Sequence, residues 1–124
     1  MFKKVKKQMQ LARDFFSKDE LDECIHYIWT VFENCLNIIK DIKNNKPLFE
    51  HKPKIEQFNI FYITGILSRD YSGFYRVLEK LRLRADLGSY SKSPKIPPKN
   101  DVRDYLSKAE ELFKETEKIV GPKK

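Results

Sequence analysis

The stretch that decides the fold is LDECIHYIWTVFENCLNIIKDIK, residues 21–43. Its apolar residues recur at alternating steps of four and three positions, which is the spacing of one face of an α-helix. The residues on this stripe are Leu21, Cys24, Ile25, Ile28, Phe32, Cys35, Ile39 and Ile42. The stripe is widened by Trp29, Val31, Leu36 and Ile38. A helix with so broad an apolar surface is expected at the centre of a bundle, in contact with more than one neighbour.

This regular seam is compatible with two kinds of packing. It favours a core position inside the monomer, because an apolar face of this width must be buried against neighbouring helices. The heptad-like spacing also suits pairing with a second copy of the chain. The sequence leaves open whether one or both of these contacts form.

A helix is also predicted before the central one, over residues 2–16. Its apolar residues fall on one face at three- and four-residue steps: Phe2, Val5, Met9, Ala12 and Phe16. The following residues, 17–20, read SKDE and have the form of a capping box, in which Ser17 and Glu20 each accept a hydrogen bond from a backbone N–H. We therefore expect the central helix to begin there. Its predicted end is at residues 43–47, since Pro47 cannot continue a helix.

Three more helices are predicted after a loop at residues 43–53. A short one covers residues 54–64 and ends at Gly65. The next covers residues 70–86, although a single kinked helix over residues 54–86 is an alternative. The last covers residues 101–120 and takes Asn100 as its N-cap. Its inner face is expected to contain Val102, Leu106, Ala109, Leu112, Phe113, Ile119 and Val120.

Together these elements predict an all-α protein, an up-and-down bundle of four long helices and one short one. A length of 124 residues fits a single domain spanning residues 1–124. No apolar stretch approaches the roughly 20 residues that cross a bilayer, and residues 1–7 are basic without the apolar core of a signal peptide. We expect a cytoplasmic protein with no membrane span.

The two cysteines are predicted to be reduced and buried. Cys24 and Cys35 lie eleven residues apart in one helix, roughly 16 Å along its axis, whereas a disulfide tolerates a Cα separation of about 7 Å. The two histidines, His26 and His51, lie in different elements and lack the spacing of metal ligands. We expect neither a metal site nor a cofactor.

Positive charge is concentrated in residues 76–99. The formal net charge of the chain is +7, and this stretch contains seven basic residues against only Glu79 and Asp86. Within it, Arg76, Lys80 and Arg84 are spaced four residues apart and form one cationic ridge on a helix. Like charges at this spacing destabilise a helix by a few tenths of a kcal/mol. An anionic partner is one explanation of the ridge, and a solvated surface is the other.

Arg82 points away from this ridge. At helical spacing it can pair with Glu79 or with Asp86. Guanidinium groups bind phosphate in a two-pronged fashion, so the functional interpretation of the segment is a surface that contacts the phosphates of a nucleotide or RNA.

Two stretches, FYITGIL at residues 61–67 and RLRADLG at residues 82–88, carry a family resemblance. They resemble the HEPN (higher eukaryotes and prokaryotes nucleotide-binding) family of helical bundles. The second stretch matches the family pattern R-x-x-A-D-Y-G at Arg82, Ala85, Asp86 and Gly88, with Leu87 in place of the tyrosine. The helices predicted around residues 21–43 and 101–120 are similar to the second and closing helices of the family, so the resemblance covers about residues 10–120.

The resemblance implies a bundle of four or five helices that commonly forms homodimers. It also implies frequent pairing with a minimal nucleotidyltransferase in a toxin–antitoxin module. Many family members are metal-independent ribonucleases that use an arginine followed four to six residues later by a histidine. This sequence has no histidine after His51, so none follows Arg76 or any later arginine. We therefore expect a non-catalytic or vestigial member that binds nucleotide, RNA or a nucleotidyltransferase partner.

The predicted site lies in and after the fourth helix. Arg82 and Asp86 are expected to shape it, and Arg76 and Arg84 to contact phosphate. The complete predicted set is Arg76, Arg82, Arg84, Asp86, Tyr90, Lys92 and Lys95. Two alternatives remain. One is a metal-independent ribonuclease with an atypical active site, and the other is a helical interaction module whose charge serves solubility alone.

Overall fold

The computed structural model describes the backbone of residues 2–43, 52–86 and 97–121, with the side chains of all of these except residues 82–86. Over these ranges the chain forms five α-helices and no strand. They are α1 (Phe2–Ser17), α2 (Leu21–Lys43), α4 (Lys54–Ile63), α5 (Ser72–Asp86) and α6 (Lys99–Val120). The prediction of an all-α helical bundle is confirmed for this part of the chain, and α4 is its short helix.

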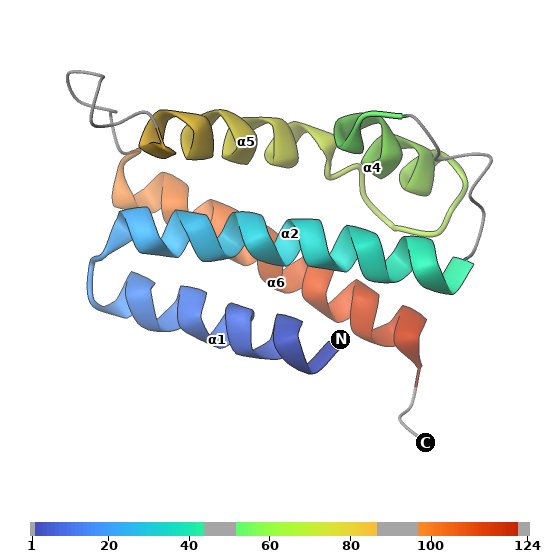
Figure 1. Ribbon diagram of the computed structural model, residues 1–124, viewed down its shortest axis with the longest axis horizontal. Helices are drawn as coiled ribbons and strands as arrows, with labels where there is room; N and C mark the ends of the chain where they lie inside the picture. The colour runs from blue at the N-terminus through green and yellow to red at the C-terminus, as the bar shows by residue number, and fades with distance from the viewer. Residues whose placement is uncertain (1, 44–51, 87–96, 122–124) are drawn as a thin grey trace.

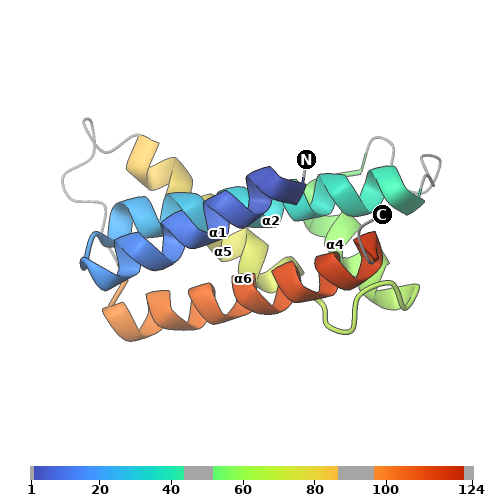
Figure 2. The same ribbon diagram turned by 90° about the horizontal axis from the view of Figure 1, so that it is seen from below.

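The helix α2 lies at the centre of the bundle, as the sequence predicted. It packs against α1, α5 and α6, and α4 packs against α5. Figure 1 shows α4 and α5 on one side of α2 and α1 on the other, with successive long helices running in opposite directions. Figure 2, turned by 90°, shows α6 running along the lower side of the bundle. The bundle therefore has α2 as its common contact element.

Four aromatic rings join α4 and α5 to α2. Phe32 of α2 lies 5.9 Å from the ring of Phe58 and 6.0 Å from that of Tyr71, and Phe58 lies 5.3 Å from Tyr75. All four side chains are fully buried. Aromatic pairs at such distances contribute about 0.5–1.5 kcal/mol beyond the area that they bury. This cluster fixes how α5 is rotated about its own axis.

Some predicted core positions differ in the structure. Ile42, placed on the apolar stripe of α2, is 45% exposed, because it lies in the last turn of the helix beyond its buried residues. In α5 the apolar stripe expected from the sequence includes Phe74, which is only half-buried, while Tyr75 is fully buried together with Leu78. The shift of one position follows from the contact of Tyr75 with Phe58.

The predicted capping box at residues 17–20 is wrong. Ser17 ends α1, and its hydroxyl donates to the carbonyl of Arg13 at 3.1 Å. The chain then reverses through Asp19, which has a φ of 60°. The N–H of Asp19 bonds to Phe16 O and that of Glu20 to Phe15 O, the pair of hydrogen bonds of a Schellman motif. Satisfying the carbonyls at the end of α1 therefore took precedence over capping α2.

The same motif ends α4 and separates it from α5. Gly65 has a φ of 81°, its N–H bonds to Tyr62 O, and the N–H of Ile66 bonds to Phe61 O. Gly65 as a helix stop is thus confirmed, and residues 54–86 form two helices rather than one kinked helix. By contrast, Asn100 is not the N-cap of α6. The helix begins at Lys99 after Pro98, whose carbonyl accepts the N–H groups of Asp101 and Val102.

Both cysteines are free and fully buried, which confirms the prediction of reduced thiols. Burial raises the pKa of Cys24 to about 11 and that of Cys35 to about 12. Within the described ranges, no helix is both long enough and apolar enough to span a membrane.

Candidate binding site

The structure describes only part of the predicted site. Arg82, Arg84 and Asp86 belong to the last turns of α5, but their side chains lie outside the described set. Tyr90, Lys92 and Lys95 lie outside the described residues altogether. Arg76 is the predicted site residue whose side chain is described, and it is exposed.

Arg76 and Lys80 share the outer face of α5. The inner face is set by Tyr75 and Leu78, which are fully buried. Arg76 and Lys80 follow on the opposite side, one turn apart and both exposed. Among the described residues, no hydrogen bond or ion pair involves either cation. This part of the predicted ridge is therefore a pair of solvated positive charges.

A polar contact beneath this face holds α5 in place. The Tyr75 hydroxyl donates to Glu33 Oε2 at 2.6 Å, and Lys54 Nζ contacts the same oxygen at 2.6 Å. Burial raises the pKa of Tyr75, and its hydrogen bond to Glu33 raises it further. The phenol thus stays neutral as a donor. Glu33 therefore links α2, α4 and α5. This link holds α5 in one rotation about its axis, so that the cationic face of Arg76 and Lys80 stays on the outer side of the helix.

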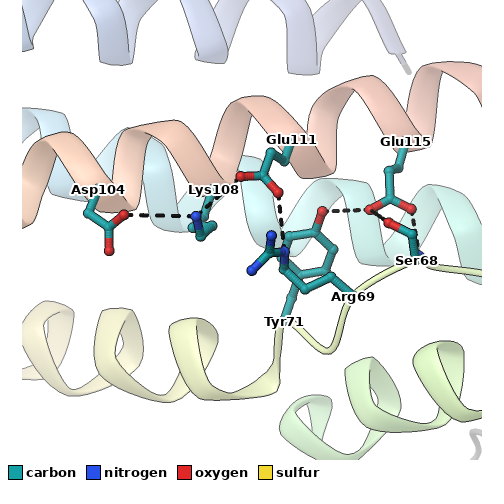
Figure 3. A network of polar contacts seen from close by, with 7 residues as sticks. All are labelled: Ser68, Arg69, Tyr71, Asp104, Lys108, Glu111 and Glu115. Carbon is teal, nitrogen blue, oxygen red and sulfur yellow. Dashed lines mark hydrogen bonds and ion pairs between the residues drawn. The ribbon is translucent and has the colours of Figure 1, made fainter.

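A second polar cluster was not predicted from the sequence. It lies where the connection between α4 and α5, residues 64–71, meets α6 (Figure 3). The carboxylate of Glu115 accepts hydrogen bonds from the Ser68 N–H at 2.8 Å, the Ser68 hydroxyl at 2.9 Å and the Tyr71 hydroxyl at 2.6 Å. Burial and then Glu115 raise the pKa of Tyr71. One carboxylate therefore fastens this connection to α6.

A row of alternating charges continues from this point along α6 (Figure 3). Arg69 Nε lies 3.2 Å from Glu111 Oε1, and Glu111 Oε2 lies 3.2 Å from Lys108 Nζ. Lys108 also lies 3.8 Å from Asp104 and stands over the ring of Phe74 at 5.5 Å. With a side chain only 16% exposed, Lys108 is the inner member of the row.

Beside this row the surface is hollowed. An open pocket of about 300 Å³ is lined by Tyr62, Ser68, Arg69, Asp70 and Glu111. Asp70 accepts hydrogen bonds from Asn59 Nδ2 and from the N–H of Ser72, both at 2.9 Å. Burial by itself would raise the pKa of Asp70, but the hydrogen bonds from Ser72 and Asn59 together lower it.

In the sequence, this pocket is marked only by three consecutive polar residues shortly after a helix stop, Ser68, Arg69 and Asp70. This signal was not sufficient, because the partner on α6 lies 47 residues away from Ser68. Within the described ranges, no group of three or more His, Cys, Asp or Glu side chains is arranged to hold a metal ion. His26 is exposed, and His51 lies outside the described residues.

Comparison of the chain with protein-family models, with curated proteins and with solved structures gives no significant match. Membership of the HEPN family is therefore an expectation based on the motif at residues 82–88.

Proposed function

We propose that this protein is a non-catalytic helical bundle of the HEPN type that binds nucleotide or RNA phosphates through the outer face of α5. The observation that carries the proposal is the pair Arg76 and Lys80. Both side chains are exposed and one turn apart, and no described residue neutralises them. Uncompensated like charges at this spacing cost helix stability, which a polyanion bound across them would restore.

The chemistry of the two residues suits phosphate. A guanidinium can donate two parallel hydrogen bonds to phosphate oxygens, and a lysine ammonium adds a point charge. Their positions lie about 6 Å apart along the helix axis, given a rise of about 1.5 Å per residue. In sequence the same ridge continues to Arg84, with Arg82 and Asp86 beside it. Lys92 and Lys95 extend the positive charge in the following segment.

The wider biological setting is also part of the proposal. The resemblance supports a cytoplasmic homodimer that works with a minimal nucleotidyltransferase in a toxin–antitoxin-like module. We propose no catalytic activity, because no histidine follows the arginines of the motif. On this proposal, metal-free protein leaves RNA intact. Cleavage that is lost in Arg82→Ala would support the ribonuclease alternative instead.

Fluorescence anisotropy with a labelled single-stranded RNA tests the phosphate-binding face. We expect affinity to fall steeply as salt rises, because binding releases counterions from the RNA. The double variant Arg76→Ala/Lys80→Ala should weaken binding at least tenfold and flatten the salt dependence. Its fold should be preserved, since both side chains are exposed.

A matched control is available on α6. Lys114 and Lys118 are exposed and also one turn apart, so Lys114→Ala/Lys118→Ala removes the same charge from another helix. Binding by this variant should stay close to that of the unaltered protein. Equal losses in both double variants would mean that only net charge matters. The absence of salt-dependent binding would favour a helical module without affinity for nucleic acid.

A further inference from the structure

Four lysines cover the outer side of the first two turns of α1. All four are exposed: Lys3, Lys4, Lys6 and Lys7. Among the described residues, none of them takes part in a hydrogen bond or an ion pair. No acidic residue precedes Asp14 in the sequence. These four residues form the lysine patch of α1, which shares no residue with the cationic face of α5.

The lysine patch is electrostatically unfavourable when it faces only water. Lys3 and Lys7 are four residues apart, and two further pairs of these lysines are three residues apart, so like charges repel along one side of the helix. Positive charge is also disfavoured in the first turn of a helix, where α1 has no acidic residue. The compensation within the described residues is one cation–π contact, with Lys6 Nζ 5.9 Å from the ring centroid of Phe2. An anionic surface in contact with the patch would relieve this repulsion.

The apolar side of α1 is already buried in the bundle. Val5, Met9 and Ala12 are fully buried, and α1 packs against α2 and α6. The ring of Phe2 stacks on that of Phe113 of α6 with their centroids 5.1 Å apart, which holds the first turn of α1 against the bundle. The helix can therefore contact a partner through its lysines without inserting an apolar face into it. Such a partner is recognised by charge.

The arrangement of the charges narrows the class of partner. At about 100° per residue, the four lysines spread over roughly 160° of the helix circumference, which makes a broad convex surface rather than a groove. Single-stranded nucleic acid is bound in positively charged grooves where aromatic rings stack on its bases. No exposed residue of α1 is aromatic, and none is an arginine that could hold a phosphate in two-pronged fashion. These features favour an extended anionic surface over a nucleic-acid strand.

Clusters of about four to eight basic residues on an amphipathic helix are typical of surfaces that bind anionic lipid headgroups. We infer that the lysine patch docks this protein on the surface of an anionic lipid bilayer, with α1 lying along the headgroups. Figure 1 shows α1 on the side of α2 that faces away from α4 and α5, so a docked protein would leave the cationic face of α5 open. The inference goes beyond the proposed function and can fail separately.

Sedimentation of the full chain with lipid vesicles tests the inference. The vesicles contain phosphatidylcholine and phosphatidylserine in equal parts, and vesicles of phosphatidylcholine alone are the reference. We expect the protein to sediment with the anionic vesicles at low salt and to stay in solution with the neutral ones. At about 1 M salt, where the Debye length is about 3 Å, binding to the anionic vesicles should be lost.

A double variant assigns the contact to the lysine patch. Each basic residue near an anionic bilayer strengthens binding about fivefold, so Lys3→Ala/Lys7→Ala should weaken vesicle binding at least tenfold. The matched control is Arg76→Ala/Lys80→Ala, which removes the same charge from exposed positions one turn apart on α5. Its vesicle binding should stay close to that of the unaltered chain. Circular dichroism should show an unchanged fold in Lys3→Ala/Lys7→Ala, because both side chains are exposed.

The inference is overturned if phosphatidylserine does not increase vesicle binding. It is also overturned if both double variants lose vesicle binding equally, since net charge alone would then explain the effect. The same variants are measured with the labelled RNA. Loss of RNA binding in Lys3→Ala/Lys7→Ala, with vesicle binding unchanged, would make the patch a nucleic-acid surface and reject a role at the bilayer. Loss of RNA binding in Arg76→Ala/Lys80→Ala concerns the proposed function alone.

Discussion

The Tyr71 hydroxyl donates a 2.6 Å hydrogen bond to Glu115, joining the start of α5 to the second half of α6 across 44 residues of sequence (Figure 3). The Tyr71 side chain is fully buried, and Glu115 also accepts both donors of Ser68. This carboxylate therefore stabilises the connection that carries the pocket residues Ser68, Arg69 and Asp70.

Removing the Tyr71 hydroxyl should destabilise the fold. Tyr71→Phe keeps the buried ring and deletes one hydrogen bond to a charged acceptor, so we expect the free energy of unfolding to fall by about 1.5–3 kcal/mol. Urea denaturation followed by circular dichroism measures this change. Tyr62→Phe is the control, because the exposed Tyr62 hydroxyl has no hydrogen bond to a described residue. Equal stability of the two variants would mean that the contact with Glu115 contributes nothing.

Two glycines should respond oppositely to alanine. Gly65 has a φ of 81°, where a Cβ is strained, so Gly65→Ala should lower stability by about 1 kcal/mol. Gly73 lies within α5 in ordinary helical geometry, and Gly73→Ala should raise stability by about 0.5–1 kcal/mol. A Cβ at either position meets no atom within 4 Å, so the difference arises from backbone conformation alone. Thermal unfolding of both variants checks the signs.

The pair Arg13 and Glu110 should couple α1 to α6 in a pH-dependent way. Arg13 Nε and Nη2 donate to the two oxygens of Glu110 at 2.5 and 2.7 Å. The hydrogen bond from Arg13 lowers the pKa of Glu110, although burial acts against it. The contribution is therefore present above the ordinary glutamate pKa of 4.5 and is lost as pH falls through the lowered value.

A double-mutant cycle with Arg13→Ala and Glu110→Ala measures this coupling. We expect about 1 kcal/mol at neutral pH, since the pair is partly exposed, and less at a pH below the lowered value. NMR titration of Glu110 should show its pKa rising in Arg13→Ala. In the double-mutant cycle, Glu117, an exposed acid on α6, serves as the control position in place of Glu110. A coupling energy that is the same at both pH values would contradict this assignment.

The two thiols should be protected in the folded protein. Cys24 and Cys35 are fully buried, and their raised pKa values of about 11 and about 12 leave little thiolate at neutral pH. We expect an aromatic disulfide reagent to label both residues only as fast as the chain opens, and at once in guanidinium chloride. Stability should also fall as pH rises from the ordinary thiol pKa of 9.0 towards these values. Rapid labelling of the native protein would show that the core opens locally.

Much of the fold could be predicted because the apolar residues of a helix recur in the sequence at a characteristic spacing. The stripe of α2 depends on residues three and four apart, so its central position and its end near residue 43 were predicted correctly, whereas its start is at Leu21 rather than within residues 17–20. The stop at Gly65 was also predicted, because a left-handed residue after a helix favours glycine. The capping box at Ser17 was predicted wrongly, because the same four residues end α1 and precede α2. The hydrogen bonds that end α1 formed there instead of those that would cap α2. Asn100 failed similarly, since Pro98 already supplied the first helical acceptor carbonyl.

The same distinction between local sequence patterns and tertiary packing applies to the candidate sites. Sequence alone determined the helices and the cationic spacing of Arg76 and Lys80, because both follow from near neighbours on one helix. Only the tertiary structure decided that Arg69 meets Glu111 and that Ser68 meets Glu115. These contacts join residues more than 40 positions apart, and their partners are set by how α5 and α6 pack around α2. Local sequence patterns carry no information about that packing, so the pocket could be identified only from the tertiary structure.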